Sequence, residues 1–512
     1  MGIPSLFRTL IDKYDDVHYW IEDTATDHLY LDYNCLIHHC KSKLVFSDSS
    51  SQRDVEEDLI AEIIKYTAYI ITHVIKPTKL VFIAVDGPVP MGKLVKQRAR
   101  RYKKLQDDTF CKLQKKKFNL PESHDFNSNK ITPGTPFMSK LMIRLKNCIH
   151  LGTFSTHIKH PKQQFKIFLS DANVPGEGEQ KIMQFISNGT SKPNGESPKM
   201  TIYGLDADLI VLSMALDKRH VKLLREPQNA SVELAQYHST PFIYLDIDKV
   251  VDALCSEYDL MSYERIRIIN DFLFFSFFGG NDFVDPFLHT KMRDNGLDKL
   301  FVAYKKALSL HGHLIDDDSI NFDTFKKLLD VIASTEDISC KKIQTRQFSH
   351  CQSKPTKNLV PQEKYELAIQ NYQHTYYSNP LNPFHLYYKQ QLMNSFDCRK
   401  PHDVWKAQYN SIFFGNKKDI CDDYLKCIKW TLHYYKKSEC PSWLWSFSHS
   451  NAPLASDFFE YISSFDSKQF AKHWKSIQFQ DDEPLSPIEQ LIAVLPPQNA
   501  GLLPFAFSAV IK

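Results

Sequence analysis

Four short apolar runs in the first 285 residues lead into acidic residues, and this pattern constrains the fold of the 512-residue chain more than any other feature. The runs and their acids are HLYLDYN with Asp32, KLVFIAVDG with Asp86, TIYGLDADLI with Asp206 and Asp208, and FFSFFGGNDF with Asp282. Longer amphipathic stretches separate the runs, for example over residues 55–75, so residues 1–300 are predicted to be a mostly parallel sheet flanked by helices, an α/β fold. Ligands of such sheets bind outside the carboxyl ends of the strands. We therefore expect these carboxylates to meet at one edge of the sheet.

Two further acids, Glu177 and Glu179 in SDANVPGEGEQK, bring the set to seven. A lone Asp at a strand end is more often a helix cap or a turn residue than a metal ligand, and that interpretation would be preferred for any single member. Seven converging carboxylates are harder to explain in this way, because buried like charges repel one another unless a cation neutralises them. Hard divalent cations prefer oxygen ligands. The set predicts a site for two cations, on the order of 4 Å apart, and phosphodiester hydrolysis as its chemistry.

A basic segment, KLVKQRARRYKK over residues 93–104, starts seven residues after Asp86 and contains seven Lys or Arg residues and no acid. At helical spacing one face carries Lys93, Gln97, Arg100 and Arg101. A solvated basic helix is the usual explanation of such a run. The nearness of Asp86 favours a phosphate-binding face instead, since Arg offers forked donors and Lys a point charge. Beside a two-cation site, such a face predicts an exonuclease that holds a terminal phosphate.

The rest of the chain is divided by composition. We expect a polar excursion or loop over residues 105–130 and a turn-rich loop over 190–200. Residues 286–310 are predicted to form a loop and an ordinary amphipathic helix. The predicted domains are a catalytic α/β region over residues 1–310, a polar linker over 311–365, and a mostly helical region over 366–512 that completes the active-site pocket.

Composition excludes several classes of protein. A net charge of +3 says little about partners, and no apolar run approaches the 18 residues of a membrane span. Eleven Cys without a CxxC pair indicate a reduced, intracellular protein, and the spacing of Cys340, His350 and Cys351 does not favour a zinc site. No secretory leader or myristoylation signal is recognised, and no GxxxxGK[ST] loop suggests an ATPase. A cytosolic or nuclear protein is expected.

The motifs resemble, in order, those of the XRN family of 5′→3′ exoribonucleases. They are MGIPSLFRTL, LDYNCLIH, VFIAVDG, KQRARRYKK, ITPGTPFM, VPGEGEQKIM, YGLDADLIVLS and FFGGNDF, followed by WTLHYYKKSECPSWLWSFSHSNAPLASD and PIEQLIAVLPPQNAGLLP. VPGEGE and YGLDADL together are highly specific for this family. The resemblance covers most of the chain and implies a sheet like that of PIN and flap nucleases.

The resemblance also implies roles for single residues. All seven acids match the family's magnesium ligands, and they would be the catalytic groups: Asp32, Asp86, Glu177, Glu179, Asp206, Asp208 and Asp282. The pocket for the 5′-monophosphate matches Lys93, Gln97, Arg100 and Arg101. His38 matches a residue that stacks on the first bases, and its aromatic partner is expected in PSWLW, at Trp443 or Trp445, with Trp443 preferred.

The sequence departs from the family pattern at Met91-Gly92, at Gln180 and at Asp285-Pro286, none of which removes a cation ligand or a phosphate donor. The long C-terminal accessory domains of the family have no counterpart here, so a compact, divergent or virus-encoded member is expected.

The expected function is processive 5′→3′ hydrolysis of 5′-monophosphorylated single-stranded RNA to nucleoside 5′-monophosphates, with two Mg2+ and with Mn2+ as an alternative. We expect a cytoplasmic monomer that bears no membrane anchor, takes substrates from the decapping machinery and acts in mRNA decay; nuclear residence stays open. One alternative is a flap-type DNA nuclease, which should carry a DNA-binding helical hairpin after the last acid. Another is an inactive RNA-binding scaffold, which should have lost at least one of the eleven acids and pocket residues.

Overall fold

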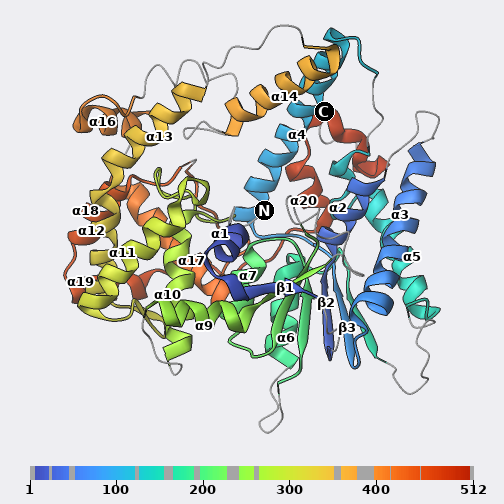
Figure 1. Ribbon diagram of the computed structural model, residues 1–512, viewed down its shortest axis with the longest axis horizontal. Coiled ribbons are helices and arrows are strands. Elements are labelled where there is room, and N and C mark those ends of the chain that lie inside the picture. Colours follow the sequence, from blue (N-terminus) through green and yellow to red (C-terminus); the bar gives the residue numbers. More distant parts are fainter. Residues whose placement is uncertain are drawn as a thin grey trace.

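The computed structural model describes residues 6–21, 26–44, 52–121, 126–154, 165–189, 197–227, 242–258, 264–350, 359–377, 397–414, 417–449 and 451–507. A twisted sheet with its covering helices forms one side of the molecule, and a group of helices from the second half of the chain forms the other (Figure 1). Among the described residues, no helix has the length and apolarity needed to cross a membrane.

Seven strands form the main sheet in the order β1-β7-β6-β5-β2-β3-β4. They are β1 (His18–Trp20), β2 (His28–Asp32), β3 (Leu80–Ala84), β4 (Lys166–Ser170), β5 (Met200–Tyr203), β6 (Val221–Arg225) and β7 (Ile243–Asp246). Strand β2 pairs in parallel with β3 on one side and with β5 on the other, so that Leu31 lies opposite both Ile83 and Tyr203. Among the described strands of this sheet, only the pairings of β7, with β6 and β1, are antiparallel. The carboxyl ends of β2, β3 and β5 therefore lie at one edge, which confirms the predicted fold class.

The alternation of side chains along β2 divides the core between the two faces of the sheet. Leu29 and Leu31 contribute to a core with helices that cover one face, and Tyr30 contributes to a core on the other. The first group of helices is α2 (Tyr33–Lys43), α3 (Gln52–Tyr69), which continues as the π-helix η2 (Ile70–Ile75), and α5 (Pro136–His150). The second group is α1 (Leu6–Lys13), α6 (Gly178–Gly189), α7 (Asp208–Ala215), α9 (Ile247–Glu257) and α10 (Arg265–Ser276).

The second half of the chain is mostly helical, as predicted. Its elements are α11 (Gly296–His311), the hairpin of β8 (Ile315–Asp316) and β9 (Ser319–Ile320), α12 (Phe322–Ser334), α13 (Glu336–His350), α14 (Pro361–Tyr377), α16 (His402–Phe413), α17 (Lys417–Lys437), α18 (Ala455–Ser463), α19 (Ser467–Ser476) and α20 (Pro487–Val494). The core that contains Tyr30 of the sheet also contains Trp430 of α17 and Phe458 of α18. The two halves of the chain thus share one continuous core, and α17 lies against α7 and α10.

Helix α4 (Met91–Lys117) is much longer than the sequence indicated. The expectation of a loop from residue 105 is wrong as far as residue 117. Ion pairs between residues one turn apart stabilise the polar half of the helix: Lys103 lies 2.6 Å from the carboxylate of Asp107, and Lys104 lies 2.6 Å from that of Asp108. The ring of Phe110 stacks on Tyr372 of α14, with centroids 4.1 Å apart. A partner helix from distant sequence therefore stabilises a segment whose own composition is typical of a loop (Figure 1).

The stretch predicted to be a polar linker contains α12 and α13. Phe325, Leu328 and Leu329 of α12 are fully buried, and α12 packs between α11 and α18. The charged residues of α12 are exposed or partly exposed, so the polar average composition of residues 311–365 hides an amphipathic helix. Residues 322–334 are therefore part of the core, while the boundaries of the three predicted domains stay predictions.

Candidate functional site

The predicted carboxylates converge at the carboxyl edge of the sheet. Asp32 is the last residue of β2, Asp86 follows β3, and Asp206 and Asp208 follow β5 at the start of α7. Glu177 and Glu179 lie at the first turn of α6, and Asp282 follows the 3-10 helix η5 (Phe277–Gly279) after α10. Because β2 lies between β3 and β5 in the sheet, acids that are distant in sequence are brought together. The ends of three strands, the starts of two helices and the end of one 3-10 helix thus position the seven acids.

Gly178 shows how closely these elements approach one another. Its backbone N–H donates to Asp86 Oδ1 at 2.7 Å. A Cβ atom at this position would lie 2.9 Å from Asp32 Oδ1 and 3.3 Å from Asp86 Oδ1. Only glycine therefore allows the start of α6 to lie against both carboxylates, which gives the GEGE motif a steric reason.

The cluster carries more negative charge than its surroundings neutralise. Burial, followed by the charge of Asp86, raises the pKa of Asp32 to about 7. Burial, followed by the charge of Asp282, raises the pKa of Asp208 to about 6. Burial and the charge of Asp208 raise the pKa of Glu179 well above its usual value. Each of these shifts is the response of a carboxylate that lacks a sufficient cationic partner.

The donor set fits hard divalent cations. Glu179 Oε2 and Asp208 Oδ1 are buried and have no hydrogen-bond partner among the residues that the structure describes. Buried carboxylate oxygens without a partner are costly, whereas they are the ligands that Mg2+ and Mn2+ prefer. The residues present therefore fit the predicted cations.

Lys93 joins the predicted phosphate pocket to the cluster. Its ammonium group contacts Glu177 and lies 2.5 Å from Asp282 Oδ2, and Arg100 Nη2 donates to Asp282 Oδ1 at 2.5 Å. Burial opposes the charge of Asp282, but Lys93 and Arg100 hold the pKa of this carboxyl well below its usual value. Two of the four predicted phosphate ligands thus already have carboxylate partners in this structure.

Arg101 and Gln97 are in a different situation. Arg101 Nη2 donates to Thr132 Oγ1 at 2.8 Å and Nη1 to the carbonyl oxygen of Gln97 at 3.3 Å. Its Nε atom and Gln97 Oε1 are buried without a partner in the described part of the chain. Burial, followed by the charge of Arg100, lowers the pKa of Arg101 to about 10. A buried guanidinium with an unused donor, next to a second cation, is an environment that an anion would stabilise.

The three predicted stacking residues lie in three kinds of environment. His38 of α2 is exposed, yet desolvation by the surrounding residues lowers its pKa, and the charge of Asp86 opposes this shift. The carbonyl oxygen of Trp443 accepts from the N–H of Met91 at 2.7 Å, which places Trp443 at the start of α4. The ring of Trp445 packs edge-on against Phe479, with centroids 5.5 Å apart. The geometry places Trp443 beside the helix that carries the pocket and gives Trp445 a packing role.

Sequence models of two families match the chain. The model described as "XRN 5'-3' exonuclease N-terminus" matches residues 1–227, and that described as "Xrn1 helical domain" matches residues 262–394 and 399–512. The chain belongs to the XRN family. The family recognised from the motifs is thereby confirmed.

Curated XRN relatives align over nearly the whole chain. The 5'-3' exoribonuclease 1 of Homo sapiens is 28% identical over 99% of this chain and 31% of its own length. The protein of the same name from Saccharomyces cerevisiae is 26% identical over 99% of this chain and 40% of its own length. The 5'-3' exoribonuclease 2 of Neurospora crassa is 30% identical over 66% of this chain and 38% of its own length. The chain thus spans between 31% and 40% of the length of these relatives.

The parts matched by the two XRN models meet at the start of α4. Besides the bond to Trp443, the N–H of Val89 donates to Gln490 Oε1 of α20 at 2.7 Å, and α20 packs along α4. Tyr434 of α17 donates to Glu177 Oε2 at 3.4 Å. The helical region therefore closes one side of the carboxylate cluster, as the sequence predicted.

Several residues near the cluster were not recognised in the sequence. Cys35 Sγ donates to Asp32 Oδ2 at 2.8 Å, and the N–H of Asp86 donates to Asn34 Oδ1 at 3.2 Å. Lys181 Nζ donates to the carbonyl oxygens of Val85 and Asp171 at 2.7 and 2.9 Å. The positions of Asn34 and Cys35 directly after Asp32 could have indicated that they lie near the cluster, because the first turn of a helix that begins at a strand end stays close to that edge of the sheet. Tyr434 gave no such signal, since its neighbour in space is 257 residues away.

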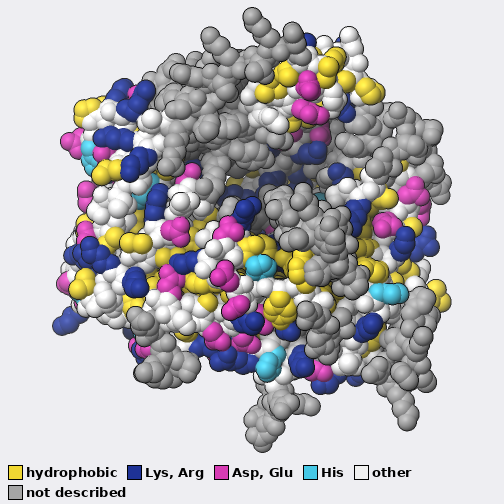
Figure 2. All heavy atoms as spheres, in the orientation of Figure 1, with side chains coloured by type: hydrophobic (Ala, Val, Ile, Leu, Met, Phe, Trp, Pro, Cys, Tyr) yellow, Lys and Arg dark blue, Asp and Glu magenta, His cyan; other side chains and the backbone are white. Residues whose placement is uncertain are grey.

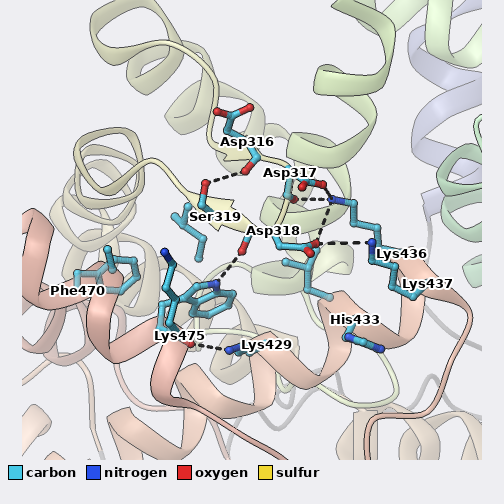
Figure 3. Close-up of a pocket in the computed structure, with 14 residues that line it drawn as sticks. Asp316, Asp317, Asp318, Ser319, Lys429, His433, Lys436, Lys437, Phe470 and Lys475 are labelled. Carbon is cyan, nitrogen blue, oxygen red and sulfur yellow. Dashed lines mark hydrogen bonds and ion pairs between the residues drawn. The ribbon is translucent and has the colours of Figure 1, made fainter.

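A separate cavity lies in the helical region, between α17, α19 and the β8–β9 hairpin (Figure 3). Its volume is about 460 Å3, and no predicted site residue lines it in the described part of the chain. Of the four lysines that line it, Lys436 lies 3.6 Å from Asp318, and Lys429 donates to the carbonyl oxygens of Trp474 and Ile477. The buried carboxylate oxygens that have no partner among the described residues make the sheet edge, and not this cavity, the candidate functional site.

Proposed function

We propose that this chain is a metal-dependent 5′→3′ exoribonuclease that hydrolyses 5′-monophosphorylated RNA to nucleoside 5′-monophosphates. The observation that carries the proposal is the position of Arg101, a buried cation with an unused donor, beside the carboxylate cluster. On α4 it lies eight residues after Lys93, about 12 Å along the helix axis. A terminal phosphate held at Arg101 would place the next phosphodiester toward the carboxylates.

In this account the residues of α4 set the point of cleavage. Arg101 and Gln97 bind the 5′-phosphate, and rotation of the Gln97 amide can present its Nε2 donor in place of Oε1. Lys93 and Arg100, which hold Glu177 and Asp282, add positive charge on the side of the pocket that faces the cluster. The face shown in Figure 2 carries Lys, Arg, Asp and Glu side chains mixed together, in keeping with a net charge of +3, so attraction of RNA depends on this local arrangement and not on bulk charge.

The seven carboxylates are proposed to hold two cations, Mg2+ or Mn2+. When bound, such a pair supplies an activated water and stabilises the leaving oxygen. His38 and Trp443 stack on the leading bases, a contact that tolerates any sequence and so permits processive movement along RNA. We assign the chain to cytoplasmic RNA decay as a monomer that receives substrates from decapping. The names of its longer relatives support RNA as the substrate class.

The two alternative functions are disfavoured by particular residues. An inactive scaffold is not expected to keep all eleven acids and pocket residues. A flap-type DNA nuclease would have a helical hairpin for DNA after Asp282. Here the chain after Asp282 leads to α11, whose Leu300, Tyr304 and Ala307 are buried in the shared core.

RNA that carries a label in its 5′-phosphate distinguishes the proposed reaction from these alternatives. A labelled mononucleotide as the first product supports exonuclease action, whereas a labelled oligonucleotide indicates flap or endonuclease cleavage. Asp206→Ala and Asp208→Ala should each abolish release without unfolding the chain. Asp481→Ala, an exposed acid outside the cluster, is the matched control and should keep full release. Release that persists in Asp208→Ala would remove the carboxylates from the mechanism.

A further inference from the structure

Cys35 adds a sulfur donor to one end of the carboxylate cluster. It lies on the first turn of α2, three residues after Asp32, and its Sγ is 2.8 Å from Asp32 Oδ2. One donor atom each from Asp32, Cys35 and Asp206 lie within 4.8 Å of one another. Donors around a zinc-like ion are about 3.5 Å apart, because bond lengths are about 2.0–2.3 Å. A single ion can therefore contact all three after small side-chain movements.

A second observation indicates that this end of the cluster can accept a cation. Glu179 is buried, its Oε2 has no partner among the described residues, and the charge of Asp32 acts on this carboxylate. The carboxylates around Asp32 thus include a buried oxygen that has no hydrogen-bond partner among the described residues.

We propose that Cys35, Asp32 and Asp206 form a binding site for a soft divalent cation of the zinc and cadmium class, and that such a cation inhibits Mg2+-dependent hydrolysis. Mg2+ is a hard ion that selects oxygen, so in its presence the thiol keeps its proton and its hydrogen bond to Asp32. Zn2+ or Cd2+ forms a bond to sulfur, and the thiol proton is released to solvent. Asp32 and Asp206 would then coordinate the soft ion and would no longer be available to the two Mg2+ ions. The inhibitory half of this inference rests on the proposed function, whereas the binding half does not.

Binding is tested without any activity assay, by titrating the purified chain with Cd2+ or Co2+. A bond from sulfur to either ion produces a charge-transfer absorption band that carboxylates do not give. The band is expected in the unmodified chain and in Cys111→Ser, and a clear loss is expected in Cys35→Ser. Cys111 is the matched control because it lies on α4, 18 residues after Lys93 and so about 27 Å along the helix. A band of unchanged intensity in Cys35→Ser would overturn the proposal.

Alkylation gives a second measurement that needs no variant. Zn2+ or Cd2+ should protect Cys35 from a maleimide, measured by mass spectrometry of its peptide, and Mg2+ should not. Equal modification with and without Cd2+ would overturn the proposal even if Cys35→Ser failed to fold.

Inhibition is measured separately, as the Cd2+ concentration that halves each variant's own rate in Mg2+. Cys35→Ser should raise this concentration by about ten-fold or more, because loss of a direct ligand costs at least as much as loss of an outer partner. If the chain gives the absorption band but no hydrolysis in Mg2+, the proposed function fails while the soft-cation site stands. If the chain hydrolyses RNA and Cd2+ inhibits the unmodified chain and Cys35→Ser equally, the soft-cation site is refuted while the proposed function stands.

Discussion

Replacing Gly178 with alanine should weaken cation binding at the carboxylate cluster. The new Cβ would lie 2.9 Å from the carbonyl oxygen of Ala84, 2.9 Å from Asp32 Oδ1 and 3.3 Å from Asp86 Oδ1. Ordinary contacts begin at 3.4 Å, so the start of α6 or the carboxylates must shift by about 0.5 Å. The bond from the Gly178 N–H to Asp86 is the first interaction that such a shift would break.

The size of the effect follows from these contacts. Overpacking costs about 1–3 kcal/mol, and the preference of a helix for alanine over glycine returns about 0.5–1 kcal/mol. Stability should therefore fall by about 0–2.5 kcal/mol. A hydrogen bond to a charged group contributes about 1.5–3 kcal/mol. Its loss, with Asp86 displaced, should weaken cation binding by about ten- to a hundredfold.

Calorimetric titration with Mn2+ measures the binding, and the Mg2+ dependence of RNA hydrolysis provides the parallel readout. Gly189→Ala is the matched control, because Gly189 is the last residue of the same helix and a Cβ there meets nothing within 4 Å. It should bind Mn2+ like the unmodified chain. Equal Mn2+ affinity in Gly178→Ala and Gly189→Ala would refute the convergence of Asp32 and Asp86 at the start of α6.

Four further predictions concern other parts of the molecule. Lys93→Met removes the cation that contacts buried Glu177 and Asp282, of which only Asp282 keeps a second cation, Arg100. It should lower the free energy of unfolding by about 3–5 kcal/mol without added metal, and an unchanged urea midpoint would contradict the ion pairs. Leu328→Ala should cost about 2–5 kcal/mol in the same assay, because its side chain is fully buried, whereas a residue in a true linker would cost nothing measurable. Burial lowers the pKa of His313, but hydrogen bonds to two carboxylates outweigh burial, and the net pKa is raised. Protonated His313 therefore stabilises the fold below about pH 6.5, and this stabilisation is lost as the pH rises through the raised pKa. His313→Gln should therefore be more destabilising in acid than at alkaline pH, and a penalty independent of pH would contradict the assignment. Trp443→Ala should weaken binding of short RNA with little loss of stability, and Trp445→Ala should do the reverse; the opposite result in fluorescence binding and thermal unfolding would exchange their roles.

The carboxylate cluster could be predicted from the sequence because topology determines it. Asp32 and Asp86 follow apolar runs directly, and parallel strands place their carboxyl ends at one edge. The direction of Lys93 could not be predicted in the same way. Helical spacing placed it on the phosphate-binding face, yet its ammonium group turns to Glu177 and Asp282, because two buried acids attract a nearby cation more strongly than solvent does.

Local composition did not predict the helical segments that residues distant in sequence stabilise. The second half of α4 is polar enough to suggest a loop, but Tyr372 of α14 stacks on Phe110 from 262 residues away. Likewise α12 lies within residues 311–365, a stretch of polar average composition, while its Phe325 and Leu328 pack in the shared core. In the second half of α4 the apolar residues are few, so only the tertiary partner shows that this segment is folded. In α12 the buried apolar residues recur at helical spacing, but the polar stretch around the helix conceals this pattern.

Degradation of one RNA prepared with four different 5′ ends tests the central claim most directly. The ends are a monophosphate, a hydroxyl, a triphosphate and a cap, each assayed with Mg2+ and with EDTA. We expect rapid loss of the monophosphate RNA alone and no loss in EDTA. The monophosphate RNA should be degraded about ten- to a hundredfold faster than the hydroxyl RNA if the phosphate forms charged hydrogen bonds to Arg101. In Arg101→Ala this preference for the monophosphate should disappear. Equal rates on all four ends, or undiminished hydrolysis in EDTA, would contradict a metal-dependent exonuclease whose cleavage position is set by binding of the 5′-phosphate.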